Sequence, residues 1–248
     1  MTKPITEKTL GIKGDYQYRA IRSRNFFQAN WHRNKWLVVD KLINLYQPQT
    51  VLDLGTGSGN FELNFATKVK KIVGLDYNDE ALTFLGSELK SKKITNVHLI
   101  NQDINKLADL SLGKFDLILI VDVLEHIPLP SVRNLVAGLA NNLNPKGKII
   151  IVTPNYQGLW PIVERLVDRF TNLPNLEDIQ HVTKFNIDLL ETVFNRDSFK
   201  IVQRGTFNTF SYLFPIKILS SLLCLLEMRL PFLWGNLIYA VFEKSAKI

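Results

Sequence analysis

Short apolar runs alternate with longer polar stretches along most of the chain. Each run has the length of a strand, and the stretches between them are helix-compatible and about as long as parallel crossovers require. The runs are VLDL (51–54), KIVGLD (71–76), VHLI (97–100), FDLILIVDV (115–123), KIIIVT (148–153), FKIVQ (199–203) and a final WGNLIYAVFEK (234–244). The alternation predicts an α/β fold built on a doubly wound sheet, in which ligands bind at the carboxyl ends of the strands.

Two regions, near the beginning and near the end of the chain, depart from this alternation. Residues 16–46 place apolar and aromatic side chains at helical spacings and predict one or two amphipathic helices. Residues 207–236 are more apolar, but Lys217, Glu227 and Arg229 divide them into pieces shorter than the roughly 20 residues of a membrane-spanning helix. We predict a late apolar helical insertion that lies on a membrane, covers a substrate as a lid, or packs on the protein or a second copy.

Length and cysteine content limit the classes of protein to which the chain can belong. The chain has 248 residues, 46% of them hydrophobic, which is enough to bury the core of one domain. Cys224 is the only cysteine, so no internal disulfide or thiolate metal cage can form. The first residues contain no apolar run of the length that a secretory signal needs. These observations predict a cytoplasmic protein.

Positive charge is concentrated at the N-terminus. The formal net charge is +7, and residues 1–50 hold nine Lys/Arg against three Asp/Glu. Such a segment suits anionic lipid headgroups or nucleic-acid phosphates, or faces only water. The chain lacks an aromatic-basic RNA-binding module, which disfavours nucleic acid as a partner.

The stretch VLDLGTGSGN (51–60) carries the strongest functional signal. Its three glycines follow an apolar run, where they allow a tight turn and bring backbone amides close to a ligand at a helix N-terminus. Asp76 ends the next apolar run, nineteen residues after Gly57, where a carboxylate can accept hydrogen bonds from both hydroxyls of a ribose. Asn60 replaces the third glycine of the dinucleotide spacing G-x-G-x-x-G, so a nicotinamide dehydrogenase is the weaker reading.

Together with VDVLEH (121–126), this turn resembles the class I S-adenosylmethionine-dependent methyltransferases, particularly their small-molecule and quinone-type branch. The resemblance covers residues 48–155 well and extends more loosely through HVTKF (181–185) to the end of the sequence. It implies a Rossmann-like, seven-stranded sheet and S-adenosylmethionine as the cofactor. We predict one methyltransferase domain over 1–248, with N-terminal basic and aromatic helices in 1–47, the cofactor-binding core in 48–155, and substrate-side insertions and final strands in 156–248.

The resemblance also implies a set of cofactor-binding residues. The methionine portion would contact the glycine turn, Asp76 would bind the ribose, the next two residues would flank the adenosine, the third strand end would meet the adenine, and the fourth would line the mouth through which the methyl passes. In chain order these are Asp53, Gly55, Thr56, Gly57, Gly59, Asp76, Tyr77, Asn78, Asp103, Ile104, Val121 and Asp122.

The candidate catalytic residues are two histidines. A sulfonium methyl is already a strong electrophile, so the protein must mainly align the acceptor, and a general base helps if the acceptor is a phenol, an alcohol or an activated carbon. His126 and His181 are the candidates, because histidine titrates near neutral pH and both follow predicted strand ends. Glu125 is expected to orient neighbouring groups. We predict no metal site, because no His/Asp/Glu cluster is evident in the sequence.

These features predict a cytoplasmic methyltransferase for a small, hydrophobic or lipid-linked acceptor, with O- or C-methylation as the reaction. The basic N-terminus and residues 207–236 would provide a peripheral contact with a membrane. Two alternatives remain open. One is a protein or RNA methyltransferase that grips its substrate with the basic N-terminal face, although the chain has DVLE where an amino-methylating enzyme of that type would have N-P-P-[YF]. The other is a protein that binds the cofactor without catalysis.

Overall fold

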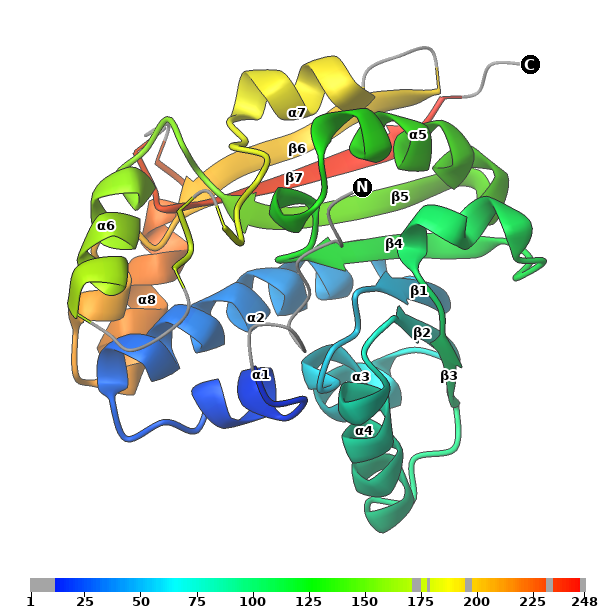
Figure 1. Cartoon of the computed structure of the whole chain (residues 1–248), viewed down its shortest axis with the longest axis horizontal. Coiled ribbons are helices and arrows are strands. Elements are labelled where there is room, and N and C mark those ends of the chain that lie inside the picture. Colours follow the sequence, from blue (N-terminus) through cyan, green and yellow to red (C-terminus); the bar gives the residue numbers. More distant parts are fainter. Residues whose placement is uncertain (1–11, 171–174, 178, 195–197, 231–233, 246–248) are drawn as a thin grey trace.

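Seven strands of the described part of the chain form a single sheet in the order β3-β2-β1-β4-β5-β7-β6 (Figure 1). The computed structural model describes residues 12–170, 175–177, 179–194, 198–230 and 234–245. The strands are β1 (Thr50–Leu54), β2 (Lys71–Asp76), β3 (Val97–Asn101), β4 (Phe115–Val121), β5 (Leu143–Pro154), β6 (Phe199–Phe207) and β7 (Leu237–Lys244). The first five are parallel, and β7 runs antiparallel between β5 and β6. The predicted doubly wound, seven-stranded α/β sheet is confirmed.

Several strand boundaries differ from those of the apolar runs; the last strand, for example, begins at Leu237 rather than at residue 234. The fourth strand ends at Val121 rather than at residue 123, because Asp122 turns the chain with a positive φ of 54°. The fifth strand begins at Leu143, before the apolar run, because Leu143 pairs with Phe115 across a register shift. The sixth strand extends to Phe207, where its ladder with β7 ends at Leu237.

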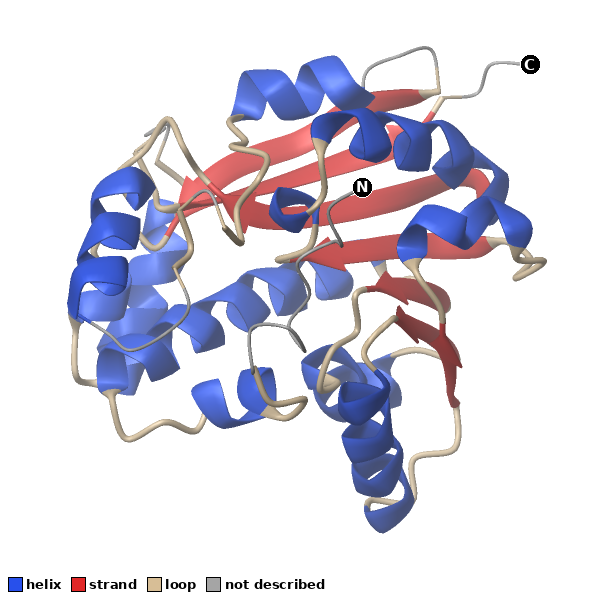
Figure 2. Ribbon diagram, viewed as in Figure 1, coloured by secondary structure: helices blue, strands red, loops and turns tan. Residues whose placement is uncertain are grey.

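Helices cover both faces of the sheet (Figure 2). They are α1 (Tyr16–Ala20), α2 (Phe26–Tyr46), α3 (Asn60–Phe65), α4 (Asp79–Ser91), α5 (Leu129–Leu139), α6 (Trp160–Phe170), α7 (Ile187–Phe194) and α8 (Lys217–Glu227). Short 3₁₀ turns are η1 (Ala66–Lys68), η2 (Ile104–Asp109), η3 (Leu124–His126), η4 (Ala140–Asn142) and η5 (Ser211–Leu213). The predicted N-terminal region therefore contains two helices, a short one followed by a long one.

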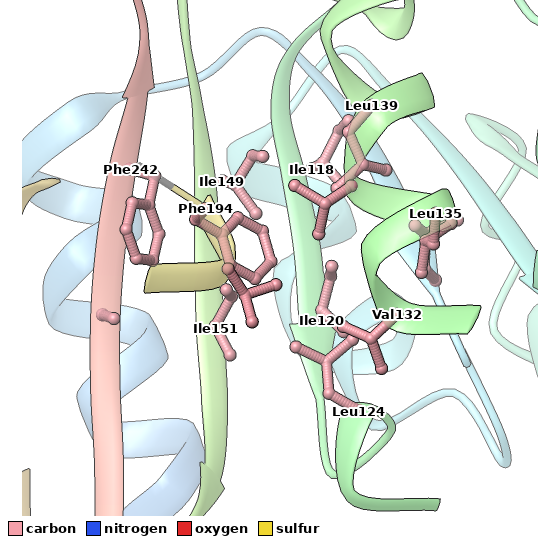
Figure 3. Close-up of a cluster of buried hydrophobic side chains, with 14 of the residues drawn as sticks. Ile118, Ile120, Leu124, Val132, Leu135, Leu139, Ile149, Ile151, Phe194 and Phe242 are labelled. Atoms are coloured by element: carbon pink, nitrogen blue, oxygen red, sulfur yellow. The ribbon is translucent and has the colours of Figure 1, made fainter. Parts of the chain in front are cut away.

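Alternate residues of each central strand face two separate hydrophobic clusters. Ile118 and Ile120 of β4 point toward α5 and α7, where Leu135 and Phe194 cover them (Figure 3). Leu117 and Leu119 point to the other face, which α2, α3 and α8 cover. Complete burial of one such side chain contributes about 1.5–3 kcal/mol, so the two clusters lock the helices onto the sheet and fix the positions of the strand ends.

The late apolar segment forms the end of β6, η5 and α8, and its residues 231–233 lie outside the described residues. Within the described ranges, none of the helices combines the length and apolar character that crossing a membrane requires. The helical insertion predicted from the sequence is confirmed for residues 217–227. Residues 1–11 of the basic N-terminus lie outside the described residues.

Candidate active site

The glycine turn joins β1 to α3 at the carboxyl end of the sheet. Gly55, Gly57 and Gly59 have φ values of 81°, 51° and 79°, in the left-handed region that favours glycine. A Cβ atom would collide with Val123 at position 55 and with Leu85 at position 59. At position 57 it would meet only the Gly55 carbonyl oxygen, at 4.0 Å. Packing therefore explains two of the glycines, whereas Gly57 faces open space that a ligand can enter.

Asp76 holds this turn from the neighbouring strand. One carboxylate oxygen accepts the backbone N–H of Gly57 at 2.8 Å, and the other accepts that of Asn78 at 2.8 Å. Burial raises the pKa of Asp76, and the backbone N–H donors of Asn78, Gly57 and Tyr77 oppose that rise. A carboxylate has about four lone-pair sites, so Asp76 keeps acceptor capacity for further donors.

Two buried acids, Asp53 and Glu62, support the glycine turn through the Thr56 side chain. Burial and then the charge of Glu62 raise the pKa of Asp53 well above its usual range. Burial raises the pKa of Glu62 to about 7, although the Thr56 hydroxyl donates to its carboxylate. The pair therefore retains a proton near neutral pH. Sequence reasoning missed Glu62, because an acid in the first turn of a helix is also what the helix dipole favours.

The next strand ends carry the residues assigned to the adenosine. Asn78 is buried and caps α4 by accepting from Glu80 N–H at 3.1 Å, while the Tyr77 side chain is 44% exposed beside it. Asp103 caps η2 through one oxygen, which accepts the Asn105 backbone and side-chain N–H groups, both at 2.9 Å. Ile104 is buried. The ladder between β2 and β3 brings these two strand ends side by side, and the roles in cofactor binding stay predictions.

The end of β4 is covered by the long N-terminal helix. Asp122 follows Val121, donates its N–H to the Val152 carbonyl at 2.9 Å, and forms an ion pair with Lys35 of α2. The Lys35 side chain is only 3% exposed. Sequence reasoning did not assign Lys35 to the site, because it is one of three Lys/Arg residues in this helix. Its neighbour His32 is buried, and burial followed by the Lys35 charge lowers its pKa well below the usual range, so it stays neutral.

His181 is held in a buried polar cluster. Its Nδ1 lies 2.6 Å from a Glu164 carboxylate oxygen of α6 and 2.9 Å from the Tyr156 hydroxyl, which donates to the same oxygen at 2.6 Å. Burial, and then the hydrogen bond to Glu164, raise the pKa of Tyr156 far above its usual value. With its proton on Nδ1 facing Glu164, the imidazole leaves Nε2 as the acceptor. The indole of Trp160 lies 5.8 Å away, centroid to centroid.

The two candidate histidines lie together although 55 positions separate them. Their ring centroids are 5.2 Å apart, and the Nδ1 of His126 bonds the Gln180 carbonyl at 2.9 Å. Glu125 joins their segments, since its carbonyl accepts the Val182 and Thr183 N–H groups at 2.9 and 3.0 Å. Burial, and then the Asp122 charge, raise the pKa of the Glu125 carboxyl to about 7. The Glu125 backbone therefore ties the two segments together, and an orienting role for its side chain stays a prediction.

Glu125, His126 and His181 also offer one metal-ligand atom each within 4.8 Å of one another. Sequence reasoning did not find this group, because its third member comes from a distant loop. The absence of a metal site stays a prediction.

Comparisons with known proteins place this chain in a family. Residues 47–197 match a family model described as a methyltransferase domain. A ubiquinone biosynthesis O-methyltransferase from Acinetobacter baylyi is 20% identical over 139 residues, which cover 56% of this chain and 55% of that protein. A ribosomal protein L11 methyltransferase from Lactobacillus johnsonii is 34% identical over 126 residues, which cover 50% of this chain and 37% of that protein. The chain thus spans about half or less of the length of these relatives.

The fold is shared with solved structures of low sequence identity. Magnesium protoporphyrin IX methyltransferase from Synechocystis, solved with bound S-adenosylhomocysteine (SAH), is 16% identical. The alignment covers 94% of both chains and has a TM-score of 0.64. Structural similarity at this level of sequence identity establishes the fold that contains the glycine turn.

Proposed function

Because the chain belongs to the methyltransferase domain family, we propose that it transfers the methyl group of S-adenosylmethionine to a small, hydrophobic or lipid-linked acceptor by O- or C-methylation. The contact between Asp76 and Gly57 carries this proposal, because it joins the carboxylate that we assign to the ribose to the backbone of the glycine turn. The fold points the same way, since a structural neighbour was solved with the demethylated form of this cofactor.

The residues present fit the cofactor. Gly57 leaves room where a side chain would intrude, and Asp76 retains lone pairs that suit ribose hydroxyls. The cofactor has no pyrophosphate, which agrees with a turn that lacks the third dinucleotide glycine. When bound, S-adenosylmethionine supplies an electrophilic sulfonium methyl group. The protein's own part is to hold the cofactor, align the acceptor and exclude water.

His181 is the base of the proposed reaction. Glu164 accepts from Nδ1 and so leaves the lone pair of Nε2, on the other side of the ring, as the base. Nε2 takes the proton of the acceptor hydroxyl or activated carbon, and the Glu164 carboxylate stabilises the imidazolium that results. His126 lies close enough to bind the acceptor beside it.

An apolar acceptor suits the aromatic side chains near this base. Trp31 of α2 lies 5.1 Å from Trp160 of α6 and 5.0 Å from Tyr212 of η5, centroid to centroid. Trp160 in turn contacts His181. Aromatic faces contribute apolar area at little cost in side-chain entropy, so this junction favours a flat or hydrophobic molecule. We place the reaction in the cytoplasm, with peripheral contact to a membrane as part of the proposal.

A protein acceptor is the second candidate. The 34% identity with the ribosomal protein L11 methyltransferase over 126 residues is the observation that favours it. That match covers 50% of this chain and therefore leaves half of it unmatched.

Calorimetric titration with S-adenosylmethionine, S-adenosylhomocysteine and NADH tests the cofactor assignment. We expect micromolar binding of both sulfur compounds and none of NADH. Transfer of a labelled methyl group to a lipid extract or to ribosomal protein then separates the two acceptor classes. Binding of neither sulfur compound would overturn the proposal. Binding without transfer to any acceptor would favour a non-catalytic cofactor-binding protein.

A further inference from the structure

The surface helix α8 turns its most apolar stripe toward solvent. Ile218, Leu222 and Leu226 are spaced four residues apart and so lie on one face of the helix. They are 73%, 55% and 52% exposed. A surface helix of a water-soluble domain ordinarily turns such a stripe toward the core.

The inward face of α8 is smaller and more polar. Ser220, Cys224 and Met228 are buried against the rest of the protein. The Asn34 side-chain amide of α2 donates to the Ser220 hydroxyl at 3.3 Å, and Cys224 packs in the hydrophobic cluster beneath α2. The orientation of α8 is therefore fixed by specific contacts, and the exposure of its leucines is part of the fold.

Residues on either side of the helix extend this apolar surface. The backbone carbonyl of Phe214 accepts from the Asn30 side chain at 2.7 Å, which ties the segment before α8 to α2. We define the α8 face by six side chains that are each more than a third exposed: Phe214, Ile216, Ile218, Leu222, Leu226 and Leu230. Figure 1 shows α8 toward one end of the molecule. An exposed apolar patch of this kind marks a contact surface.

The exposed charged residues of the segment that forms the α8 face are positive. Lys217 and Arg229 are exposed near its two ends. Glu227, the one acid in residues 207–230, is turned inward. One of its oxygens accepts the Phe210 and Ser211 N–H groups at 2.8 and 2.9 Å, and the other accepts the Thr209 N–H at 3.1 Å. The face therefore presents leucine and isoleucine between two cations, with its carboxylate directed into the protein.

We propose that the α8 face docks on the surface of an anionic lipid bilayer, with the helix axis parallel to the membrane. Apolar side chains enter the boundary between headgroups and acyl chains, and the flanking cations pair with lipid phosphates. A symmetric contact between two copies fits less well, because it would bring together cations from both copies on a face that turns its acid inward. The inference deepens the membrane contact of the proposed function and does not depend on methyl transfer.

Vesicle flotation tests the proposal directly. The full chain is mixed with vesicles of phosphatidylcholine alone or with about 30% phosphatidylglycerol. We expect flotation with the anionic vesicles and a severalfold weaker partition when salt is raised from about 0.1 M to 0.5 M, because salt screens the cations. The double variant Ile218→Asn/Leu222→Asn should reduce the partition coefficient at least about tenfold, because two inserting side chains are lost. Both positions are exposed, so the variant should keep its melting temperature.

Matched variants separate docking through the α8 face from nonspecific adsorption to the vesicles. Leu45→Asn changes a leucine that is 62% exposed near the C-terminal end of α2, and it should float like the parent protein. Lys217→Glu/Arg229→Glu should weaken flotation on anionic vesicles and lose the salt dependence. Equal flotation of all variants, or no flotation of the parent, would overturn the proposal. So would a dimer in analytical ultracentrifugation that Ile218→Asn/Leu222→Asn dissociates, because a second copy would then cover the face. Cofactor binding measured on the same variants stays intact in either case, so failure here leaves the proposed reaction untouched.

Discussion

The carboxylate of Asp76 at the end of β2 accepts the backbone N–H of Gly57, in the turn after β1, at 2.8 Å. The second strand thus holds the turn that leaves the first one. A Cβ atom at Gly57 would meet no neighbouring side chain within 4 Å. The side chain that we propose for ribose binding is therefore also the one that supports the turn.

Asp76→Ala is expected to weaken S-adenosylmethionine binding about 10- to 100-fold, because hydrogen bonds to a charged acceptor contribute roughly 1.5–3 kcal/mol. Calorimetric titration measures this, with Asp109→Ala, an exposed acid at the end of η2, as the matched control. Unchanged affinity in a folded Asp76→Ala protein would remove the ribose assignment.

Gly57→Ala and Gly59→Ala are expected to affect different properties, cofactor affinity in the first variant and stability in the second. At position 57 the added Cβ has space, so stability should fall by only about 1 kcal/mol from the positive φ, while cofactor affinity drops sharply. At position 59 the Cβ collides with Leu85, and the free energy of unfolding should fall by about 1–3 kcal/mol. Thermal unfolding and cofactor titration of both variants check this, and identical behaviour of the two would contradict it.

Glu164→Gln should lower kcat by roughly 100-fold or more while leaving the KM for S-adenosylmethionine unchanged. The glutamine amide can donate to Nδ1 of His181, which moves the imidazole proton to Nε2 and removes the base. His181→Asn should have a loss of the same order, and Glu88→Gln on α4 is the matched control. The pH profile of kcat separates a base from a structural residue, because the limb for the basic group should disappear in both variants.

The free energy of unfolding should fall as pH rises from about 4.5 to about 7, in part because of Glu62. Its pKa is raised from the usual 4.5 to about 7 by burial, so the folded state favours the protonated acid. That contribution is fully present below pH 4.5 and is lost as pH rises through 7; it amounts to about 3 kcal/mol at most. Glu62→Gln mimics the protonated acid, so its denaturation curves should depend less on pH than those of the parent. Parallel pH dependences in the two proteins would argue against the raised pKa.

Chelation should leave turnover unchanged if His181 acts as a base without a metal. Dialysis against EDTA, followed by assay with and without added Zn²⁺ or Mg²⁺, measures this. A loss of activity that one metal restores would instead make Glu125, His126 and His181 a metal site, since their ligand atoms lie within 4.8 Å.

The sequence by itself determined the sheet and the glycine turn. Each apolar run forms a strand in the structure. A buried strand can be predicted from the hydrophobic pattern of a short stretch of sequence alone. The sequence also placed the glycine turn and Asp76 at the ends of successive strands, and these ends lie at the same edge of the sheet because β1 and β2 are parallel. The strands and the glycine turn could be predicted because the signal for each lies within a short stretch of sequence.

Only the tertiary structure decided which charged groups meet and which way the apolar helix faces. The Lys35–Asp122 ion pair joins residues 87 positions apart. The pair of Glu164 and His181 depends on how α6 packs near Trp31. In α8, composition predicted an apolar helix, but the polar contact between Ser220 and Asn34 turned its leucines outward. Long-range packing selects one helix rotation among several that the local pattern allows, so the candidate base and the α8 face could be described only from the fold.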